Sequence, residues 1–439
     1  MKSRQTVQLI TLGCPKNIVD SEVLIRQLES NHFKIACDGE EPDIAIINTC
    51  GFINDAKRES IDTVLHALKL KKERRIKKVL VMGCLIERYQ RELESELPEV
   101  DAFVGTNKLD EVLRSLGGSL QYDLLGERVL TTPSHYAYLK IAEGCDRPCS
   151  FCSIPRIRGK HVSKPIEQIV KEAGNLAAAG VKELIIIAQD STYYGLDLYG
   201  KRQLGQLLQR LGDVDGIEWI RLMYAFPTGF PEDVLEQFNE NRKLCRYLDV
   251  PVQHVSDSIL GSMKRGIGSS ELRRLIDRIR TRVPGIALRS TLIVGYPNEG
   301  EKEFSELLQF VEATEFERLG VFMYSQEDDT SAYSLGDPVP RGVKEERMNI
   351  IMEAQQEIAR RKNQLLVDVP VRVLIDRKEG NTSIGRTQFD APEIDNEVTI
   401  SNAHHLHLGS FYSVQIVDAD AYDLFATYPQ GTGVESTVR

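Results

Sequence analysis

Short apolar runs alternate with amphipathic stretches along the first 120 or so residues of the chain. The runs cover residues 7–12 (VQLITL), 44–48 (IAIIN) and 78–82 (KVLVM), and segments such as SEVLIRQLES and ESIDTVLHALKL lie between them. Continuous apolar runs are typical of buried strands, whereas apolar residues at three- and four-residue spacing are typical of helices. The pattern predicts βαβ units with a parallel sheet, and we expect this N-terminal domain to cover residues 1–125.

A second series of strand-like runs begins at Tyr136. Its six runs are AYLKIA, ELIIIA, WIRLMYA, YLDVPV, ALRSTLIV and RLGVFMY, and a helical or loop stretch follows each of them. This alternation predicts a barrel-like α/β domain over residues 131–366. The periodic segment EERMNIIMEAQQEIARRKNQLL predicts a closing helix that packs across this barrel or joins it to the tail.

The pattern changes again after residue 366. Five short runs with alternating polarity, separated by turn residues, are VPVRVLID, SIGRTQ, EVTI, FYSVQIV and YDLFATY. Short strands of this kind predict a small antiparallel β-barrel over residues 367–439. The expected fold class is therefore α/β, with an N-terminal parallel α/β domain, a partial (β/α) barrel and a C-terminal small antiparallel β-barrel.

Three of the eight cysteines form a Cys-x3-Cys-x2-Cys pattern in the segment EGCDRPCSFCSIP. We call Cys145, Cys149 and Cys152 the barrel cysteines, because they follow the first strand of the barrel series, where barrel enzymes build their sites. A four-iron cluster takes one thiolate for each iron, so three cysteines leave one iron open for a ligand. Zinc also binds thiolates, but no fourth Cys or His lies beside these three at zinc spacing.

Three further cysteines each follow the end of a predicted strand, in LITLGC, AIINTC and LVMGC. We call Cys14, Cys50 and Cys84 the N-terminal cysteines. The carboxyl ends of parallel strands line one edge of a sheet, so these thiols could converge as a second set of ligands. Singly, each could equally be a small buried hydrophobe, and the three equivalent placements favour ligands. Cys37 and Cys245 lack this context, and we interpret both as packing or surface residues.

The segment EGCDRPCSFCSIP resembles the signature of the radical S-adenosylmethionine (SAM) superfamily, and TLGCPKN, INTCGF and MGCLIER resemble the N-terminal part of the methylthiotransferase family, which ends in a TRAM domain. The likeness covers nearly the whole chain. It implies an enzyme with SAM and two [4Fe-4S] clusters as cofactors. The barrel cysteines would hold the cluster whose open iron binds SAM as the radical source, and the N-terminal cysteines the cluster that supplies or carries sulfur.

Further segments at strand ends resemble family sequence less closely. Gln189, Arg221, His254, Arg265 and Glu299 are the candidates there for contact with SAM or substrate, although ordinary polar loop residues would look the same. In this chemistry the cofactors carry the difficult steps, so no acid–base dyad is expected and the catalytic residues stay unassigned.

Charge bears on the choice of substrate. The formal net charge is −10, and residues 367–439 hold eleven acidic and five basic side chains, a net charge of −6. An acidic barrel would repel RNA and attract a basic protein. The hairpin GRTQFDAPEIDN also resembles the family branch that modifies a ribosomal protein. Phe389, Phe411 and Tyr412 could stack on bases, although aromatic residues in a small barrel also form its core.

We therefore expect a methylthio group to be added to the β-carbon of an aspartate in the twelfth protein of the small ribosomal subunit. The alternatives are a transfer-RNA adenosine methylthiotransferase and a non-enzymatic iron–sulfur carrier. The expected partners are the ribosomal protein and donors of sulfur and electrons, with RNA binding disfavoured. No signal-peptide h-region and no apolar window of membrane-spanning length is present, so we expect a cytoplasmic protein without membrane contact. No heptad seam or long exposed apolar edge is apparent, so we expect a monomer.

Overall fold

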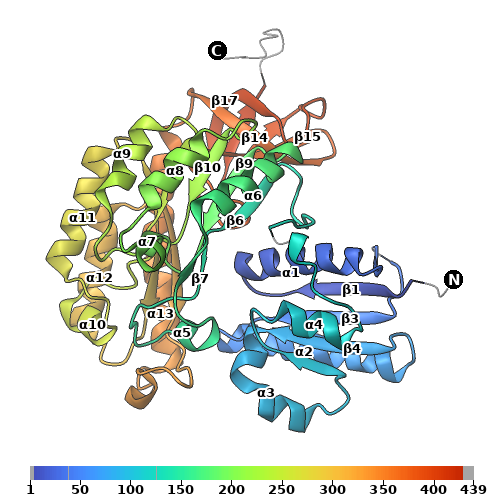
Figure 1. Ribbon diagram of the computed structural model, residues 1–439. Helices are drawn as coiled ribbons and strands as arrows, with labels where there is room; N and C mark the ends of the chain where they lie inside the picture. Colours follow the sequence, from blue (N-terminus) through green and yellow to red (C-terminus); the bar gives the residue numbers. More distant parts are fainter. Residues whose placement is uncertain (1–3, 38, 125, 429–439) are drawn as a thin grey trace.

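The computed structural model describes residues 4–37, 39–124 and 126–428. Two α/β units and a β-barrel follow one another along the chain (Figure 1). The N-terminal unit lies near one end of the central strands, and the C-terminal barrel lies near the other end. Among the helices in these ranges, none combines the length and apolar character needed to cross a membrane.

The N-terminal unit is a five-stranded parallel sheet in the order β2-β1-β3-β4-β5. All six residues of the strand IAIINT are buried, as expected where helices cover both faces of a parallel sheet. The three predicted strands are confirmed, and only the two shortest strands escaped prediction. The elements are β1 (Thr6–Thr11), α1 (Pro15–Ser30), β2 (Lys34–Ile35), β3 (Ile44–Thr49), α2 (Asn54–Lys72), β4 (Lys78–Gly83), α3 (Cys84–Glu96), β5 (Ala102–Val104) and α4 (Leu109–Ser115).

The central unit is a sheet of six parallel strands in the order β13-β12-β11-β10-β9-β6, which stays open between its two edge strands. Its strands are the six predicted ones: β6 (Tyr136–Lys140), β9 (Glu183–Ile187), β10 (Trp219–Leu222), β11 (Leu244–Asp249), β12 (Ala287–Val294) and β13 (Arg318–Met323). The covering helices are α6 (Ile166–Ala178), α8 (Leu204–Gly212), α9 (Glu232–Glu240), α11 (Ser269–Arg282), α12 (Glu301–Thr314) and α13 (Arg341–Gln364). The shorter elements are β7 (Ala142–Glu143), α5 (Ile154–Ile157), β8 (Val162–Ser163), α7 (Leu196–Tyr199), α10 (Asp257–Ser262) and 3-10 turns at Ser191–Tyr193 and Tyr333–Leu335, and a further 3-10 turn at Tyr122–Leu124 precedes the unit.

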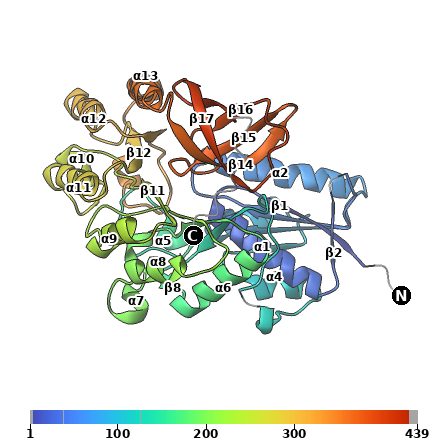
Figure 2. The ribbon, with the colours of Figure 1, turned by 90° about the horizontal axis from the view of Figure 1, so that it is seen from above.

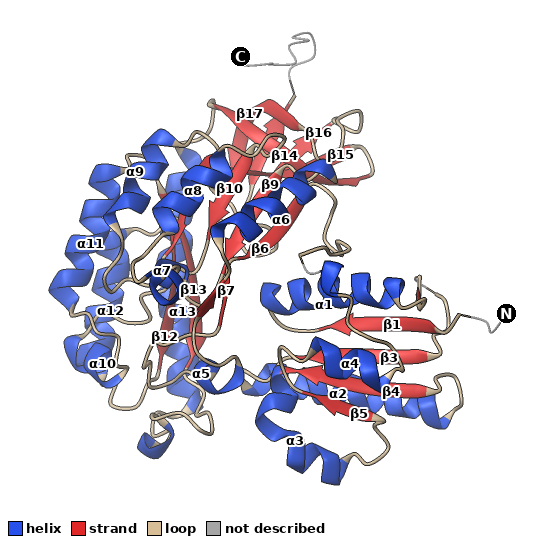
Figure 3. Cartoon of the chain, viewed as in Figure 1, coloured by secondary structure: helices blue, strands red, loops and turns tan. Residues whose placement is uncertain are grey.

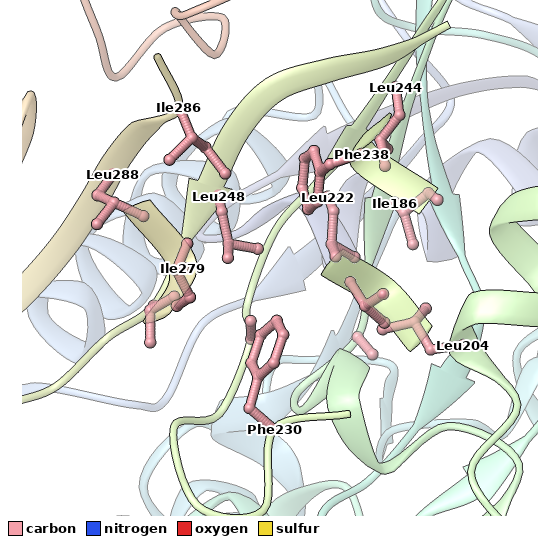
Figure 4. Packing of buried hydrophobic residues seen from close by; sticks show 14 of the residues in the cluster. Ile186, Leu204, Leu222, Phe230, Phe238, Leu244, Leu248, Ile279, Ile286 and Leu288 are labelled. Atoms are coloured by element: carbon pink, nitrogen blue, oxygen red, sulfur yellow. The ribbon is translucent and has the colours of Figure 1, made fainter. Parts of the chain in front are cut away.

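Alternate side chains of the central strands pack on opposite faces of the sheet. Ile186, Leu222 and Leu248 belong to the cluster shared with the outer helices, where they pack with residues such as Phe238 and Ile279 (Figure 4). Figure 3 shows these helices along the outside of the strands. The inward-facing residues form a separate cluster, which includes side chains of the N-terminal unit and of the C-terminal barrel. The inner face is therefore closed by the two flanking domains.

The C-terminal unit is a closed five-stranded barrel in the order β14-β15-β16-β18-β17. The prediction of a small barrel is confirmed, with one difference: β16 and β18 pair in parallel, while the other pairs are antiparallel. Helix α13 packs on β13 and also contacts β17, so it both packs on the central barrel and joins it to the tail (Figure 2). The strands are β14 (Pro370–Glu379), β15 (Thr382–Thr387), β16 (Val398–Ser401), β17 (Phe411–Ala419) and β18 (Leu424–Thr427).

Several acidic residues of this barrel do not form the open acidic face that the charge count suggested. They are bound at the junction with the central barrel, where basic side chains and a tyrosine donate hydrogen bonds to them. The pairs are Asp376 with Arg386 and His135, Asp390 with Arg318, and Asp395 with Tyr247. The charge presented to a partner is therefore smaller than the count of residues implies.

The three aromatic residues of the tail also serve packing. Phe411 lies edge-on to Trp219 of the central barrel with ring centroids 4.7 Å apart, and Phe389 packs against the same inward-facing cluster. Tyr412 packs against Tyr428 within the C-terminal barrel. Their positions match the core interpretation rather than a stacking platform for bases.

Candidate active site

The barrel cysteines lie in the loop between β7 and α5. Gly144 precedes the first of them with a φ of +75°, and a Cβ there would stand 2.0 Å from the carbonyl oxygen of Lys160, so only glycine fits. The backbone N–H of Cys145 donates to the Gly159 carbonyl at 3.1 Å, and that of Cys152 donates to Cys149 at 3.2 Å. The backbone thus holds the three cysteines in one short loop.

Ser150 fixes this loop to the rest of the central barrel. Its N–H donates to the carbonyl of Met263 at 3.0 Å, and its own carbonyl accepts from the N–H of Ala332 at 2.8 Å. Its hydroxyl oxygen lies 2.8 Å from the hydroxyl oxygen of the buried Tyr296. The loop is therefore anchored from three directions, as a preorganised site requires.

Cationic and aromatic side chains surround the barrel cysteines. Arg265 donates from Nη1 to the sulfur of Cys149 at 3.2 Å, and its guanidinium lies 4.1 Å from the ring centroid of Phe226. The guanidinium of Arg147 lies at the same distance from that ring. Burial raises the pKa of Cys152 to about 12. Because metal ligands must be thiolates, cluster binding here has to displace the thiol proton, and the nearby cations favour the resulting negative charge.

The N-terminal cysteines stand at the carboxyl ends of three adjacent strands, as the sequence predicted. Cys14 follows β1, Cys50 follows β3, and Cys84 follows β4 and begins α3. A Cβ on Gly13, whose φ is +90°, would lie 2.7 Å from the Cβ of Cys50, so the first two cysteine loops touch. Burial raises the pKa of Cys84 to about 12 against the opposing charge of Arg158, and the charges of the other two thiols add to the rise.

Neither cysteine trio forms a site for a single ion. Among the described residues, no group of three His, Cys, Asp or Glu side chains converges closely enough to ligate one metal ion. A four-iron cluster makes a different demand, because each thiolate binds its own iron. Thiolate donors are the ligands that such clusters take, so the donor set of each trio fits one cluster. The two remaining cysteines stand apart, since Cys37 is exposed and Cys245 is buried within β11.

Arg158, which follows α5 in the segment of the barrel cysteines, reaches α1 beside the N-terminal cysteines. Its guanidinium donates to the side-chain oxygen of Asn17, and from Nη1 to Asp20 at 2.6 Å and to Glu143 at 3.2 Å. The same oxygen of Asn17 lies 3.8 Å from the sulfur of Cys84. Burial alone would lower the pKa of Arg158, but the three negative neighbours Asp20, Cys84 and Glu143 raise it above the ordinary value. A permanent cation thus stands beside the N-terminal cysteines.

A second buried cation lies two residues after Cys14. Lys16 reaches from α1 toward the central barrel, where its Nζ stands 3.1 Å from the ring centroid of Tyr224. Burial lowers the pKa of Lys16 to about 8, against the opposing charges of Cys14 and Asp249. The amine therefore lies between the N-terminal cysteines and the strand ends of the central barrel.

Two of the five candidates for contact with SAM or substrate adjoin this region. Arg265 meets Cys149, as described, and Gln189 donates to Glu143 at 2.6 Å while its own oxygen is buried without a hydrogen-bond partner among the described residues. His254 and Glu299 are fully buried and lie 3.4 Å apart. Glu299 also accepts a hydrogen bond from Arg347 of α13 at 2.9 Å. Its carboxylate therefore joins the strand end to α13.

The expectation for Arg221 is wrong. This residue lies inside β10, is fully buried, and donates from Nε to Glu183 at 2.7 Å and from Nη1 to the carbonyl of Gln388 at 2.8 Å. It belongs to the junction with the C-terminal barrel. The run WIRLMYA extends past the strand, so its arginine falls within the strand and points toward the C-terminal barrel.

Sequence reasoning missed the polar and charged residues that lie where the two cysteine-bearing segments meet. Lys16, Asn17 and Asp20 follow the first N-terminal cysteine, and Arg158 follows the barrel cysteines, so closeness to the cysteines in sequence was the available signal. What no signal revealed is that the two segments meet, because their contacts join residues more than 130 positions apart.

Three family models match the chain: the uncharacterized protein family UPF0004 over residues 6–105, the radical SAM superfamily over residues 139–311, and the TRAM domain over residues 370–428. The chain is 52% identical over 428 residues to the ribosomal protein uS12 methylthiotransferase RimO of Chloroherpeton thalassium, covering 97% of this chain and 98% of that protein. It is also 52% identical over 426 residues to the protein of the same name from Flavobacterium johnsoniae, covering 96% and 98%.

Solved structures share the fold at low sequence identity. The radical SAM methyltransferase TsrM from Kitasatospora setae matches with a TM-score of 0.54 at 14% identity, over 75% of this chain and 77% of that one. The cobalamin-dependent SAM radical enzyme OxsB matches with a TM-score of 0.51 at 15% identity, over 80% and 56%. At these identities the likeness concerns the fold alone.

Proposed function

The chain belongs to the ribosomal protein uS12 methylthiotransferase family, and on that premise we propose that it places a methylthio group on the β-carbon of an aspartate in that protein. It is a radical SAM enzyme, and SAM and a [4Fe-4S] cluster are its cofactors. The relatives named above modify a ribosomal protein, which favours this function over the transfer-RNA alternative and over an iron–sulfur carrier.

The barrel cysteines would hold the cluster that binds SAM. When bound, cluster and SAM supply a 5′-deoxyadenosyl radical able to take a hydrogen atom from the substrate carbon. The protein's share is positioning and shielding. Arg265 donates to the sulfur of Cys149, and Phe226 lies beneath the guanidinium groups of Arg265 and Arg147, so an aromatic ring and two cations close this side of the site.

The N-terminal cysteines would hold a second [4Fe-4S] cluster, which supplies or carries the sulfur. The single observation that carries this proposal is the reach of Arg158. This residue follows the barrel cysteines by six positions or more, yet its guanidinium contacts Asn17 beside Cys84. The segment that follows the barrel cysteines therefore packs beside the N-terminal cysteines, which supports a substrate carbon held between two clusters.

We propose that donors of sulfur and of electrons serve the enzyme in addition to the uS12 substrate. We also propose that the three domains cover residues 1–125, 131–366 and 367–439. The family matches fall within these limits.

Iron and sulfide content under anaerobic conditions tests the two-cluster proposal. The reconstituted protein is expected to hold about eight irons, falling to about four when the barrel cysteines are replaced by alanine, and likewise when the N-terminal cysteines are replaced. The matched control is Cys245→Ala, which removes a buried thiol outside both trios and should leave the content unchanged. About four irons in the wild type, lost with the barrel cysteines, would remove the N-terminal trio from the mechanism.

The substrate is tested by mass spectrometry. Enzyme supplied with SAM, a sulfur source and a reductant should replace one hydrogen of uS12 by a methylthio group, and fragmentation should place it on an aspartate. Modification of transfer RNA with no mass gain on uS12 would refute the assignment.

A further inference from the structure

Lys16 is a buried cation that pairs directly with no anion in the part of the chain that the structure describes. The residue is 7% exposed, and its ammonium group takes part in none of the ion pairs or side-chain hydrogen bonds formed among residues 4–37, 39–124 and 126–428. Burying an ammonium without a partner is costly, so a residue of this kind is retained where something else compensates it.

Besides Cys14, which we assign to a cluster, the negative groups that act on Lys16 are carboxylates occupied by other donors. The charges of Asp249 and Glu143 both act on Lys16. Asp249 accepts from Nη1 of Arg289 at 3.0 Å and from the backbone N–H of Tyr224 at 3.0 Å. Its carboxylate is thus held by a strand neighbour and by a main-chain donor, at the end of β11.

Glu143 is occupied in the same way. One of its oxygens accepts from Lys140 at 2.7 Å and from Arg158 at 3.2 Å, and the other accepts from Gln189 at 2.6 Å. Neither carboxylate near Lys16 is therefore free to turn toward it without giving up donors it already has.

What Lys16 does contact is an aromatic ring. Its Nζ lies 3.1 Å from the centroid of Tyr224, whose backbone is held at a φ of +60°, a conformation that is uncommon for a residue other than glycine. A ring face attracts an ammonium group but leaves its N–H donors largely unused. The amine is thus positioned with its hydrogen-bond donors available.

Building on the proposed function, we propose that Lys16 binds the side-chain carboxylate of the substrate aspartate. The amine lies two residues from Cys14 and against Tyr224, which follows the end of β10, so it stands between the N-terminal trio and the central barrel. The carbon to be modified is bonded directly to that carboxylate. A charge-assisted hydrogen bond from Lys16 would therefore fix the β-carbon between the two trios and select aspartate over asparagine.

The test compares two substrates and four enzymes. The substrates are uS12 and its variant with asparagine in place of the modified aspartate. The enzymes are the wild type, Lys16→Met, Lys16→Arg and the control Lys69→Met, which removes an exposed lysine of α2. The quantity measured is kcat/KM for methylthio transfer, with iron content and the KM for SAM determined alongside.

The wild type and Lys69→Met should prefer aspartate by on the order of 10- to 100-fold, because asparagine offers Lys16 a neutral amide oxygen in place of a carboxylate and so loses the charge-assisted hydrogen bond. Lys16→Met should lose most of this preference, chiefly through the aspartate substrate, and Lys16→Arg should retain it. The ratio compares two substrates on one enzyme, so it does not depend on how much of a variant is correctly folded.

Two results would overturn the inference. The first is a Lys16→Met enzyme that keeps the aspartate preference while its iron content falls or its KM for SAM rises, because Lys16 would then serve a cofactor. The second is a Lys16→Arg enzyme without the preference. A wild type that modifies neither form of uS12 would refute the proposed function itself, which is a separate outcome.

Discussion

Arg386→Met removes the central cation of the junction between the central and C-terminal barrels. The side chain of Arg386 is 2% exposed, and it donates to Glu183 at 2.9 Å and to Asp376 at 2.6 Å. Methionine keeps most of the apolar length but leaves Glu183 with Arg221 and Asp376 with His135 as remaining partners. The substitution therefore tests whether the C-terminal barrel is held by buried charge pairs or by packing alone.

Breaking a buried ion pair by removing one partner costs about 3–5 kcal/mol. Since each carboxylate here keeps a second partner, we expect a value near the lower end, about 3 kcal/mol. For a unit of 150–250 residues, this corresponds to a fall in Tm of about 6–12 °C. The matched control is Arg377→Met. Its side chain is 45% exposed and pairs with Glu397 at the surface, where such pairs contribute about 0–1 kcal/mol.

The fluorescence of Trp219 is a suitable probe, because it is the only tryptophan and it packs against Phe411 at this junction. The protein has several domains, so this local signal is easier to interpret than one global transition. Unfolding of Arg386→Met at the Tm of Arg377→Met would refute the reasoning.

The fall in Tm caused by Arg386→Met should also depend on pH. Burial by itself would raise the pKa of Asp376, but Arg386 and the hydrogen bond from His135 outweigh it, and the pKa is lowered. A carboxyl with a lowered folded-state pKa gives stability that is complete above its ordinary pKa of about 4 and is lost as the pH falls through the folded value. The difference in Tm between wild type and Arg386→Met should thus shrink below about pH 4. A difference that stays constant would contradict the charge explanation.

Two further substitutions address the barrel cysteines. Gly144→Ala should abolish one cluster, lowering the iron content by about four, because its Cβ would strike the Lys160 carbonyl, whereas Gly180→Ala, at a similar positive φ but with open space around it, should keep all the iron. Arg265→Met should lower the reduction potential of the SAM-binding cluster by roughly tens of millivolts, because it removes a cationic donor to Cys149. Redox titration measures this difference, with Arg156→Met, which replaces an exposed arginine, as the control. Equal potentials in the two variants would show that the hydrogen bond does not tune the cluster.

The strands were predictable because each is a short apolar run whose neighbours are amphipathic. That property located all six strands of the central barrel, whereas alternating polarity between turn residues located the five strands of the tail. Strand β2, with two residues, and β5, with three, carry too little pattern to be recognised. The parallel pairing of β16 with β18 joins strands separated by β17 in sequence, and such long-range pairing leaves no local sequence signature.

The cysteine positions were predictable for a geometric reason. Adjacent parallel strands end at one edge, so Cys14, Cys50 and Cys84 had to become neighbours once the sheet was recognised. The contact from Arg158 to Asn17 was not predictable in this way, because it depends on how two separately folded sheets dock. Periodicity describes which face of an element is buried, but not which element of another domain covers it.

The charge count over residues 367–439 favoured the ribosomal protein as substrate, but it included carboxylates that the fold buries. Asp376, Asp390 and Asp395 enter the count, yet their carboxylates are bound inside the junction. Such groups contribute little to a field that steers a partner, because neighbouring cations cancel them at short range. The exposed acids of the tail, such as Asp418 and Asp420, can still attract a basic protein. If they do, replacing these two residues by asparagine should lower the association rate with uS12, and the difference from the wild type should vanish at high salt. The control Asp390→Asn should destabilise the junction but leave the salt dependence of the association rate unchanged.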